Sequence, residues 1–315
     1  MPELPEVETI VRTLSAQVLG KRISAVTVLH GKSLQYGGER LSELTGARFI
    51  RLFRRAKLAM AELLLPDGNT TVFLAFHLKM TGRFFVHPPG SEPLKHTRII
   101  FDLEPEGDVS PDASSSSFIH TSPETPPHPG ARGKKPAKKA APRGGGRLFF
   151  DDMRTFGYCR LMAPEELSCW SFWQSLGPEP LETPDVTLAQ RFAGSKAAIK
   201  AVLLDQAVVA GVGNIYADES LFRAGILPMA RASSLAPERL EALAGHLKDV
   251  LRQSIDECGS SIRDYRDAQG NAGAFQNNFA VYGRKGETCR LCGSPLEATR
   301  VAGRGTVYCP KCQLG

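Results

Sequence analysis

The chain has 315 residues, which is room for two domains of ordinary size, and 42% of them are hydrophobic, as in folded proteins. Its formal charge of +6 is a modest basic bias that suits a polyanionic partner but does not require one. No apolar run approaches the roughly 18 residues of a membrane span, and the N-terminus lacks the layout of a signal peptide. We therefore expect a soluble cytoplasmic protein that does not bind membranes.

The N-terminus places Pro2 next to two carboxylates, Glu3 and Glu6. Removal of Met1, which is usual before a small residue, leaves Pro2 as a free secondary amine. An α-amino group has a pKa of about 8, so much of it is neutral near pH 7.4, and its attack on an electrophilic carbon gives an iminium that promotes elimination. A plain helix start is the simpler interpretation of the same residues, because Pro5 and Glu6 suit the first turn of a helix.

The next part of the chain predicts one helix followed by β-strands. Apolar side chains recur at helical spacing and give the helix an apolar stripe: Val7, Ile10, Val11, Leu14 and Val18. Strand patterns cover 23–29, 49–53, 58–65, 71–78 and 98–103, with a turn at 66–69, and they resume at 147–150 and 157–162. Packing of the helix on these strands would fix Pro2 in space.

Residues 104–146 interrupt the strand pattern. This stretch contains a serine run at 114–117, a proline-rich patch at 123–129 and a basic run at 132–139. With almost no aliphatic residues it cannot bury enough surface to offset the entropy of ordering, so we expect a disordered insertion in a loop of the β domain. A solvated linker is favoured over a phosphate-binding segment or an import signal.

From Leu188 on, the sequence has helical periodicity. Helices are predicted around 199–203, 214–224 and 237–256, separated by glycine-containing turns. Asn214 begins a helix after a Gly-Val-Gly turn, where the backbone N–H groups form a natural seat for a phosphate. A simple N-cap role for Asn214 is the alternative.

Four cysteines in the C-terminal tail form two Cys-x-x-Cys pairs separated by sixteen residues: Cys289, Cys292, Cys309 and Cys312. Four thiolates at this spacing fit a tetrahedral structural zinc that closes a β-hairpin too small to fold unaided. Disulfides are the alternative, but nothing in the sequence suggests secretion. The remaining cysteines are expected to be buried thiols: Cys159, Cys169 and Cys258.

The opening Met-Pro-Glu-Leu-Pro-Glu-Val-Glu-Thr-Ile, the segment 208–222 and the four-cysteine tail together resemble the formamidopyrimidine-DNA glycosylases, bifunctional enzymes of base-excision repair. The resemblance covers the chain apart from 104–146. It implies an α+β multidomain protein with an N-terminal β-sandwich and helix (1–165), a helix-two-turn-helix domain (166–280) and a zinc-ribbon hairpin (281–315). It also implies one structural Zn²⁺ and, as partner, damaged double-stranded DNA bound by a monomer. A bacterial protein would be associated with the nucleoid, and a eukaryotic one would be nuclear.

The resemblance implies catalytic roles for five residues. Pro2 matches the nucleophile and Glu3 the acid that protonates the opening sugar, while Glu6 would orient Pro2 or the sugar hydroxyls. Lys57, at the end of an Arg-Arg-Ala-Lys run, matches the lysine that contacts the phosphate at the damaged nucleotide and assists elimination, and Arg304, in the hairpin, matches the arginine that is inserted toward the lesion. Both would stabilise the departing phosphates or act as acids. Read in isolation, Lys57 would be a solvent-facing strand residue and Arg304 a surface arginine.

Six further residues match DNA contacts of the family: Met80, His96, Arg154, Phe156, Lys196 and Asn214. Met80, Arg154 and Phe156 would fill the void left by the extruded base, since they offer an apolar wedge, a bidentate donor and an aromatic plate. Outside the family context, Met80 and Phe156 would be assigned to a core.

The chain departs from the family pattern in three places. Ser195 replaces a basic residue, which leaves Lys196 and Lys200 for phosphate contacts, while Met153 and Thr155 stand where proline and a second arginine are frequent. None of these departures removes a residue that we assign to chemistry.

The implied activity is that of a DNA-formamidopyrimidine glycosylase with abasic-site lyase activity. After extrusion of the nucleotide, Pro2 displaces the base at C1′, and β- and δ-elimination leave a one-nucleotide gap. The segment 260–275 matches the loop that covers 8-oxoguanine, which favours oxidised purines over the oxidised pyrimidines of endonuclease VIII. A non-catalytic zinc-ribbon DNA-binding protein, the more distant alternative, has no use for a terminal proline beside Glu3.

Overall fold

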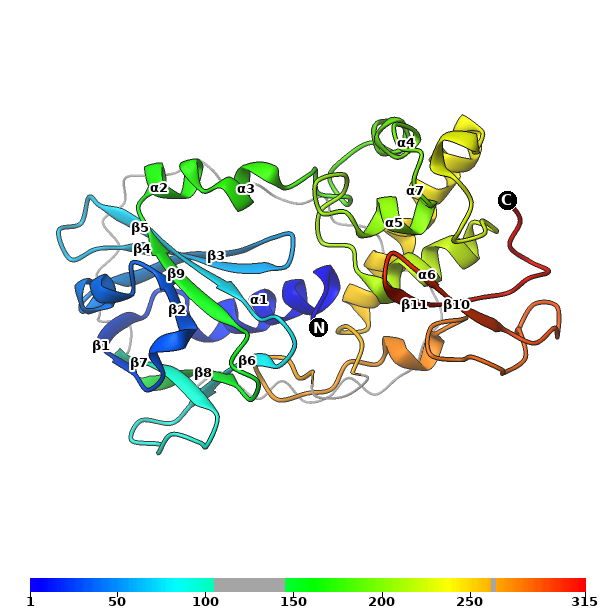
Figure 1. The fold of residues 1–315 in the computed structure, drawn as a ribbon. Coiled ribbons are helices and arrows are strands. Elements are labelled where there is room, and N and C mark those ends of the chain that lie inside the picture. The colour runs from blue at the N-terminus through cyan, green and yellow to red at the C-terminus, as the bar shows by residue number, and fades with distance from the viewer. Residues whose placement is uncertain (105–144, 262–264) are drawn as a thin grey trace, which may run out of the picture.

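The computed structural model describes residues 1–104, 145–261 and 265–315. Figure 1 shows a sheet body built from the N-terminal half, a helical body built from the C-terminal half, and the N-terminus between them. The expected disordered insertion at 104–146 lies, except for its ends, outside the described residues, as do 262–264 of the expected loop at 260–275.

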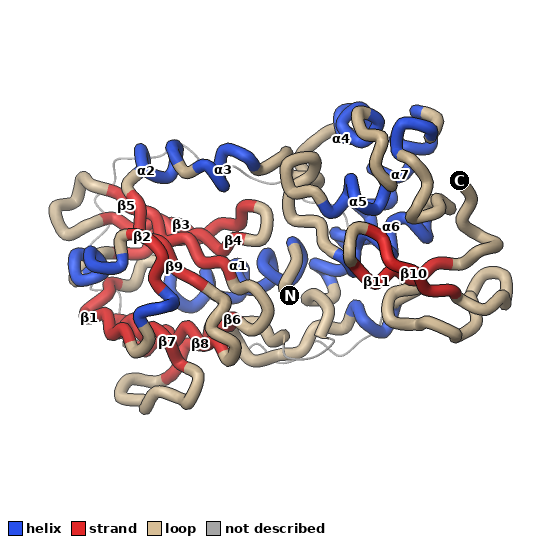
Figure 2. The backbone as a smooth tube through the Cα atoms, viewed as in Figure 1, coloured by secondary structure: helices blue, strands red, loops and turns tan. Residues whose placement is uncertain are grey.

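The sheet body begins with helix α1 (Leu4–Val18) and contains nine strands joined in the order β2-β9-β5-β4-β3-β1-β7-β8-β6. The strands are β1 (Arg22–Val28), β2 (Leu34–Tyr36), β3 (Arg48–Arg55), β4 (Leu58–Leu64), β5 (Thr71–His77), β6 (Gly82–His87), β7 (Thr97–Glu104), β8 (Gly146–Asp152) and β9 (Tyr158–Met162). Only one residue pair, Arg22 with Arg48, joins β1 to β3. The sheet therefore folds over at this point into the two layers of a sandwich (Figure 2).

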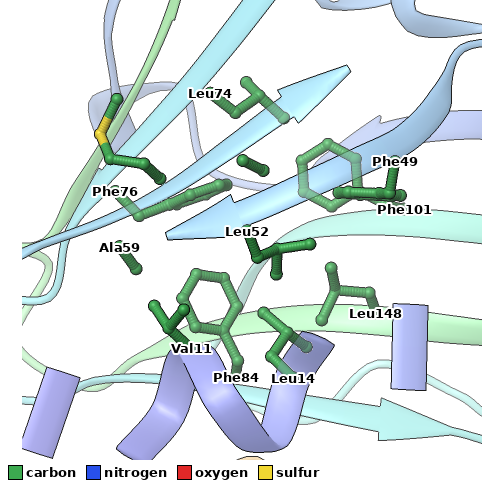
Figure 3. Close-up of a pocket in the computed structure, with 12 residues that line it drawn as sticks. Val11, Leu14, Phe49, Leu52, Ala59, Leu74, Phe76, Phe84, Phe101 and Leu148 are labelled. Carbon is green, nitrogen blue, oxygen red and sulfur yellow. The ribbon is translucent and has the colours of Figure 1, made fainter. Parts of the chain in front are cut away.

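Helix α1 packs against β3, β4 and β6, strands of both layers. Its expected apolar stripe is buried in the main core, because every residue of the stripe belongs to the same cluster as the aromatic side chains of the strands. Phe76 and Phe84 meet edge to face at 4.9 Å across the layers. A small apolar cavity remains between Val11, Leu14 and the strands, and its lining offers no charged side chain (Figure 3).

The helical body contains α4 (Asp185–Ala193), α5 (Ile199–Leu204), α6 (Asn214–Arg223) and α7 (Pro237–Asp256) around a second core. Before it, α2 (Pro164–Cys169) and α3 (Ser171–Ser175) run along the outer face of the sheet. Short 3-10 helices lie at Gly31–Ser33, Gly38–Leu44, Ala232–Ser234 and Phe275–Asn278.

The C-terminal hairpin consists of β10 (Glu297–Val301) and β11 (Arg304–Tyr308). Its two turn residues, Ala302 and Gly303, both have positive φ angles of 50° and 70°, the geometry of a tight type I′ turn. The hairpin packs on α6, and a small apolar cluster that includes Phe222 and Val281 supports its cysteines.

The structure confirms the α+β fold class and the expected strands and helices, but sequence patterns missed β2, β6, α2 and α3. Cys159 is buried as expected, whereas Cys169 and Cys258 are exposed because each lies at the end of a surface helix, so that part of the expectation was wrong. No helix in the described part of the chain is long and apolar enough to cross a membrane.

Candidate active site

The N-terminal residues are fixed between the two bodies of the molecule. Pro2 is buried directly before α1, and the backbone N–H of Leu4 donates to the carbonyl of Gly211 at 3.0 Å. Gly211 has a φ of +83°, and a Cβ atom there would lie 2.8 Å from the Leu4 side chain. A glycine turn of the helical body thus holds the first turn of a helix that belongs to the sheet body.

Glu3 lies at the N-terminus of α6. Only 4% of it is exposed, and its Oε1 accepts the N–H of Ile215 at 3.2 Å. Gly213 makes room for this carboxylate, since a Cβ atom at Gly213 would lie 2.3 Å from Glu3 Cδ. Burial raises the pKa of Glu3 to about 7, although the positive charge of Lys57 opposes the shift. A carboxyl group with this pKa can donate a proton near neutral pH.

Glu6 connects three parts of the chain. Its Oε2 accepts the N–H of Glu3 at 2.8 Å, and its Oε1 accepts the N–H of Ser260 at 2.8 Å and the hydroxyl of Tyr216. Burial raises the pKa of Glu6, and these donors oppose the shift. The carboxylate therefore links the reactive end of α1 to α6 and to the start of the segment 260–275.

Lys57 lies in the β3–β4 turn and is only 8% exposed, so it is not a solvent-facing strand residue. Burial lowers its pKa; the charges of Glu3 and Glu6 oppose this shift, and that of Arg304 adds to it. The ammonium group is thus near enough to both carboxylates for their charges to act on it. We call Pro2, Glu3, Glu6 and Lys57 the reactive cluster.

An ion-pair network holds the turn that carries Lys57. The carboxylate of Glu179 pairs with Arg54 at 2.6 Å and with Arg55 at 2.9 Å, and it accepts the N–H of Ala56 at 2.6 Å. Glu179 follows α3 on the connection to the helical body. The position of Lys57 therefore depends on a residue more than one hundred positions later in the sequence.

Arg304 is exposed at the tip of the hairpin, and the residues after it are anchored to the helical body. Lys200 is fully buried, pairs with Asp218 at 2.7 Å and donates to the carbonyl of Gly305 at 3.0 Å. Lys200 is thus unable to contact a phosphate, which corrects that expectation, because the ion pair and the hairpin occupy its ammonium group. Burial lowers its pKa and Asp218 opposes the shift.

Asn214 is the first residue of α6, and the N-cap is Gly213, so the N-cap alternative was wrong. The Asn214 side chain donates instead to the carbonyl of Gly305 at 2.9 Å, next to Arg304.

Lys196 is exposed in the loop before α5. His96 is partly exposed, and its carbonyl accepts the N–H of Asp152 at 2.9 Å.

Met80, Arg154 and Phe156 form an exposed group that we call the wedge patch. Met80 is 43% exposed and Phe156 is 55% exposed, so neither belongs to a core. The Arg154 Nη1 atom lies 3.0 Å from Met80 Sδ, and the guanidinium lies over the Phe156 ring at 4.9 Å. The patch joins the loop after β5 to the loop before β9, two loops of the sheet body.

Buried polar residues under the wedge patch hold it in place. The Asp152 carboxylate accepts the N–H of Arg154 at 3.2 Å, the N–H of Gly157 at 2.6 Å and the hydroxyl of Thr81. Sequence reasoning missed both Asp152 and Thr81. The only signal was their position next to matched residues, since each lies one or two positions from Met80 or Arg154.

The described part of the segment 260–275 packs on α1. Ala268 is 3% exposed and belongs to the core cluster of the sheet body; its N–H donates to Thr13 Oγ1 at 3.2 Å, and its carbonyl accepts from Gln17 at 3.3 Å. The hydroxyl of Tyr265 donates to the carbonyl of Glu6 at 3.4 Å. This segment of the C-terminal half therefore lies beside the reactive cluster.

The four tail cysteines bring their sulfur atoms within 4.8 Å of one another. The Sγ atoms of Cys292 and Cys309 are 3.5 Å apart, and those of Cys289 and Cys312 are 3.9 Å apart. A disulfide requires about 2.05 Å, whereas tetrahedral Zn–S bonds of about 2.3 Å place sulfur atoms roughly 3.8 Å apart. The donor set fits one structural zinc and excludes the disulfide alternative in this geometry.

Family models match three parts of the chain. The formamidopyrimidine-DNA glycosylase N-terminal domain matches residues 1–113, the formamidopyrimidine-DNA glycosylase H2TH domain matches 176–266, and a zinc finger found in FPG and IleRS matches 286–314. The zinc-finger match and the geometry of the four sulfur atoms together confirm the prediction of one structural Zn²⁺.

Whole proteins and a solved structure are similar as well. A formamidopyrimidine-DNA glycosylase of Desulfitobacterium hafniense is 40% identical over 318 residues, which cover 100% of both chains. One of Nitratidesulfovibrio vulgaris is 55% identical over 249 residues, 79% of this chain and 58% of that longer protein. The crystal structure of a Lactococcus lactis FPG mutant in complex with Fapy-dG containing DNA superposes with a TM-score of 0.80 at 29% identity and covers 100% of both chains.

Proposed function

The chain belongs to the formamidopyrimidine-DNA glycosylase family of base-excision repair enzymes, and we propose that it removes oxidised purines from duplex DNA and cleaves the strand at the abasic site. The observation that carries the proposal is the buried reactive cluster, in which Glu3 with a pKa of about 7 adjoins Pro2. A non-catalytic DNA-binding protein has no need of a buried carboxyl group beside a potential amine.

The reaction would begin with extrusion of the damaged nucleotide, because its C1′ atom is inaccessible in a stacked duplex. The wedge patch would fill the space that remains, with Arg154 facing the orphan cytosine. Its exposure supports this role, since an inserted wedge has to project from the surface.

Chemistry would follow at Pro2 once Met1 has been removed. The Pro2 nitrogen forms a bond to C1′, and the base departs with the electrons of the glycosidic bond and takes up the proton that the amine loses. The C1′–O4′ bond of the sugar then breaks as Glu3 donates its proton to O4′, which leaves an iminium between Pro2 and C1′. The resulting iminium makes the C2′ hydrogen acidic, so that β-elimination expels the 3′ phosphate and δ-elimination the 5′ phosphate. Lys57 and Arg304 stabilise these phosphates as they leave, and Glu6 orients Pro2.

Other residues would bind DNA without taking part in chemistry. We assign His96, Lys196 and Asn214 to contacts with the DNA backbone. His96 is partly exposed and Lys196 is exposed, which supports the assignment for these two residues. Asn214 would contact a phosphate through its side-chain amide, because the Glu3 carboxylate already accepts the N–H of Ile215 at the N-terminus of α6. Zinc would stabilise the hairpin that presents Arg304.

We propose domain limits at 1–165, 166–280 and 281–315, which the end of β9 at Met162 and the separate cores support. We also propose that the enzyme acts as a monomer, in the nucleoid of a bacterium, since the relatives named above are bacterial.

The substrate class can be tested with duplexes that carry one lesion opposite cytosine or adenine. We expect excision of 8-oxoguanine and formamidopyrimidine to exceed that of thymine glycol, because the segment 260–275 lies beside the reactive cluster. The relative crystallised with Fapy-dG DNA supports the same preference. Faster excision of the oxidised pyrimidine would instead favour the endonuclease VIII type of activity.

A further inference from the structure

Tyr216 is a fully buried residue of α6 to which the mechanism above gives no role. Its hydroxyl contacts Oε1 of Glu6, and it lies 2.7 Å from Ser254 Oγ on α7 and 3.2 Å from Ser260 Oγ. Three elements of the C-terminal half thus meet at a carboxylate on α1.

The direction of these hydrogen bonds follows from the groups involved. An ionised carboxylate has no proton to give, so the phenol donates to Glu6 and the Ser254 hydroxyl can donate to the phenol oxygen. Burial raises the pKa of Tyr216 well above its ordinary value, and the charge of Glu6 adds to the shift. The phenol therefore keeps its proton throughout the pH range in which the enzyme would act.

The other oxygen of Glu6 holds the backbone next to the nucleophile. Oε2 accepts the N–H of Glu3 at 2.8 Å, and this nitrogen belongs to the planar peptide that follows Pro2. The terminal torsion of a glutamate has a broad energy profile, so the orientation of its carboxylate depends on its hydrogen-bond donors. Without the phenol, Oε1 would keep only the N–H of Ser260.

We propose that Tyr216 is a positioning residue for the nucleophile: it orients the Glu6 carboxylate, which holds the Pro2–Glu3 peptide and so aims the Pro2 nitrogen at C1′. This inference rests on the proposed function, because it takes Pro2 to be the attacking group. Tyr216 is 0% exposed, and its hydroxyl contacts Glu6, Ser254 and Ser260, so it would act through Glu6.

A purely structural role for Tyr216 would lie in its ring, which packs against Phe275 with centroids 5.8 Å apart. Tyr216→Phe keeps this packing and removes only the hydroxyl. Tyr36→Phe is a matched control, because the Tyr36 hydroxyl donates to the Glu166 carboxylate at 3.0 Å on an exposed surface. Ser254→Ala removes the second partner of the phenol while leaving its bond to Glu6.

The experiment measures the rate of borohydride trapping on abasic-site DNA at saturating enzyme from pH 5 to 9, the affinity for tetrahydrofuran-containing DNA, and thermal stability. For Tyr216→Phe we expect a rate roughly 10- to 100-fold lower, the effect of one lost hydrogen bond to a charged group, with unchanged affinity. Ser254→Ala should lower the trapping rate less than Tyr216→Phe does, and Tyr36→Phe should leave the rate unchanged.

The pH profile separates positioning from packing. A carboxylate that loses a donor has a higher pKa, so protonation of Glu6 in Tyr216→Phe should add to the protonation of Pro2 and make the acid limb of the profile steeper than in the wild type. Among the described residues, the ionisable groups whose charges act on or are acted on by Glu6 are Glu3 just before α1, Lys57 in the β3–β4 turn, Tyr216 and Tyr265. Tyr216→Phe leaves the other three in place.

A wild-type rate and profile in Tyr216→Phe would overturn the inference, and so would a rate loss that follows weaker DNA binding or a lower melting temperature. If the wild-type enzyme gives no trapped adduct at all, the proposed function fails instead. The two failures are therefore distinguishable in one set of measurements.

Discussion

The reactive cluster and the wedge patch are built in opposite ways. The reactive cluster is buried, and its geometry depends on both bodies, since Gly211 and Ile215 of the helical body bind the first residues of α1. The wedge patch is exposed and stands on two loops of the sheet body, held from below by Asp152. The proposed chemistry would thus require the docked arrangement of both halves, whereas the proposed recognition of the opposite base would require one half alone.

This difference predicts which measurements respond to substitution. Changes in the reactive cluster, or in the residues that hold it, should alter rates and leave lesion binding largely intact. Changes in the wedge patch should alter the preference for the opposite base while the chemistry persists.

The largest effect is expected for Pro2→Gly. The substitution replaces the secondary amine by a primary amine in another geometry, so strand cleavage should be abolished, while the phosphate contacts preserve lesion binding. Single-turnover cleavage and DNA affinity are measured on the same abasic duplex. Cleavage by the variant at the wild-type rate would contradict the proposal that the iminium forms on Pro2.

Gly213→Ala should have the next largest effect. A Cβ atom 2.3 Å from Glu3 Cδ forces the carboxyl group out of its place at the N-terminus of α6, and a positioned general acid contributes about 100- to 10,000-fold. Excision of 8-oxoguanine is the measurement. Gly245→Ala, where the nearest atom is 3.5 Å away, is the control and should keep the wild-type rate.

Cys309→Ser should lower DNA affinity rather than the rate of the bound complex. Loss of the zinc removes on the order of 10 kcal/mol of apparent folding energy, so the hairpin that presents Arg304 unfolds, whereas the core of the sheet body stays intact. Zinc content, circular dichroism and binding to abasic DNA report on these points. One bound zinc and unchanged affinity in the variant would refute the account of the hairpin.

The excision rate should depend on pH through both members of the Pro2–Glu3 pair. The pKa of Glu3 is raised to about 7, so its proton is lost as the pH rises above this value, and the rate then falls up to tenfold per unit. An α-amino group ordinarily has a pKa of about 8, so a free Pro2 nitrogen would be protonated and lose reactivity as the pH falls. A bell-shaped profile with its maximum between about 7 and 8 should result. The Glu3→Gln variant should lack the fall in rate at high pH. If this fall persists in the variant, the assignment of Glu3 as the general acid is contradicted.

The smallest effect should appear at the wedge patch. Arg154→Ala should reduce the discrimination between lesions opposite cytosine and adenine by about 1–3 kcal/mol, with little change in cleavage of an abasic site. Arg51→Ala is the control, because Arg51 lies over the Phe53 ring on β3 and not on the loops that carry the wedge patch. If Arg154→Ala leaves this discrimination unchanged, the wedge patch does not recognise the opposite base.

The sequence predicted those helices and strands that short-range patterns of residues determine. The helix α7 was expected at 237–256 and is found at Pro237–Asp256, because its apolar period and initial proline are local signals. The strand β6 was missed, since its Phe84, Phe85 and Val86 form a short run without clear alternation, although flanking Gly82 and Pro88 could have revealed it.

The candidate site shows the same limit. Pro2, Glu3 and the tail cysteines were identified from adjacent residues, but Tyr216 and Asp152 act through contacts with residues more than seventy positions away. Lys200 gives the clearest case, because it lies in a basic stretch that suggested a phosphate contact, and only the fold reveals its buried pairing with Asp218.

The central claim is that the nitrogen of Pro2 carries the chemistry of the buried cluster, and the most direct test locates the covalent bond. The enzyme is incubated with abasic-site DNA and borohydride, digested with nuclease and protease, and the modified peptide is sequenced by mass spectrometry. The account predicts a sugar remnant on the N-terminal Pro2 of a chain that has lost Met1. A remnant on Lys57, or no adduct from an enzyme that cleaves the strand, would contradict it.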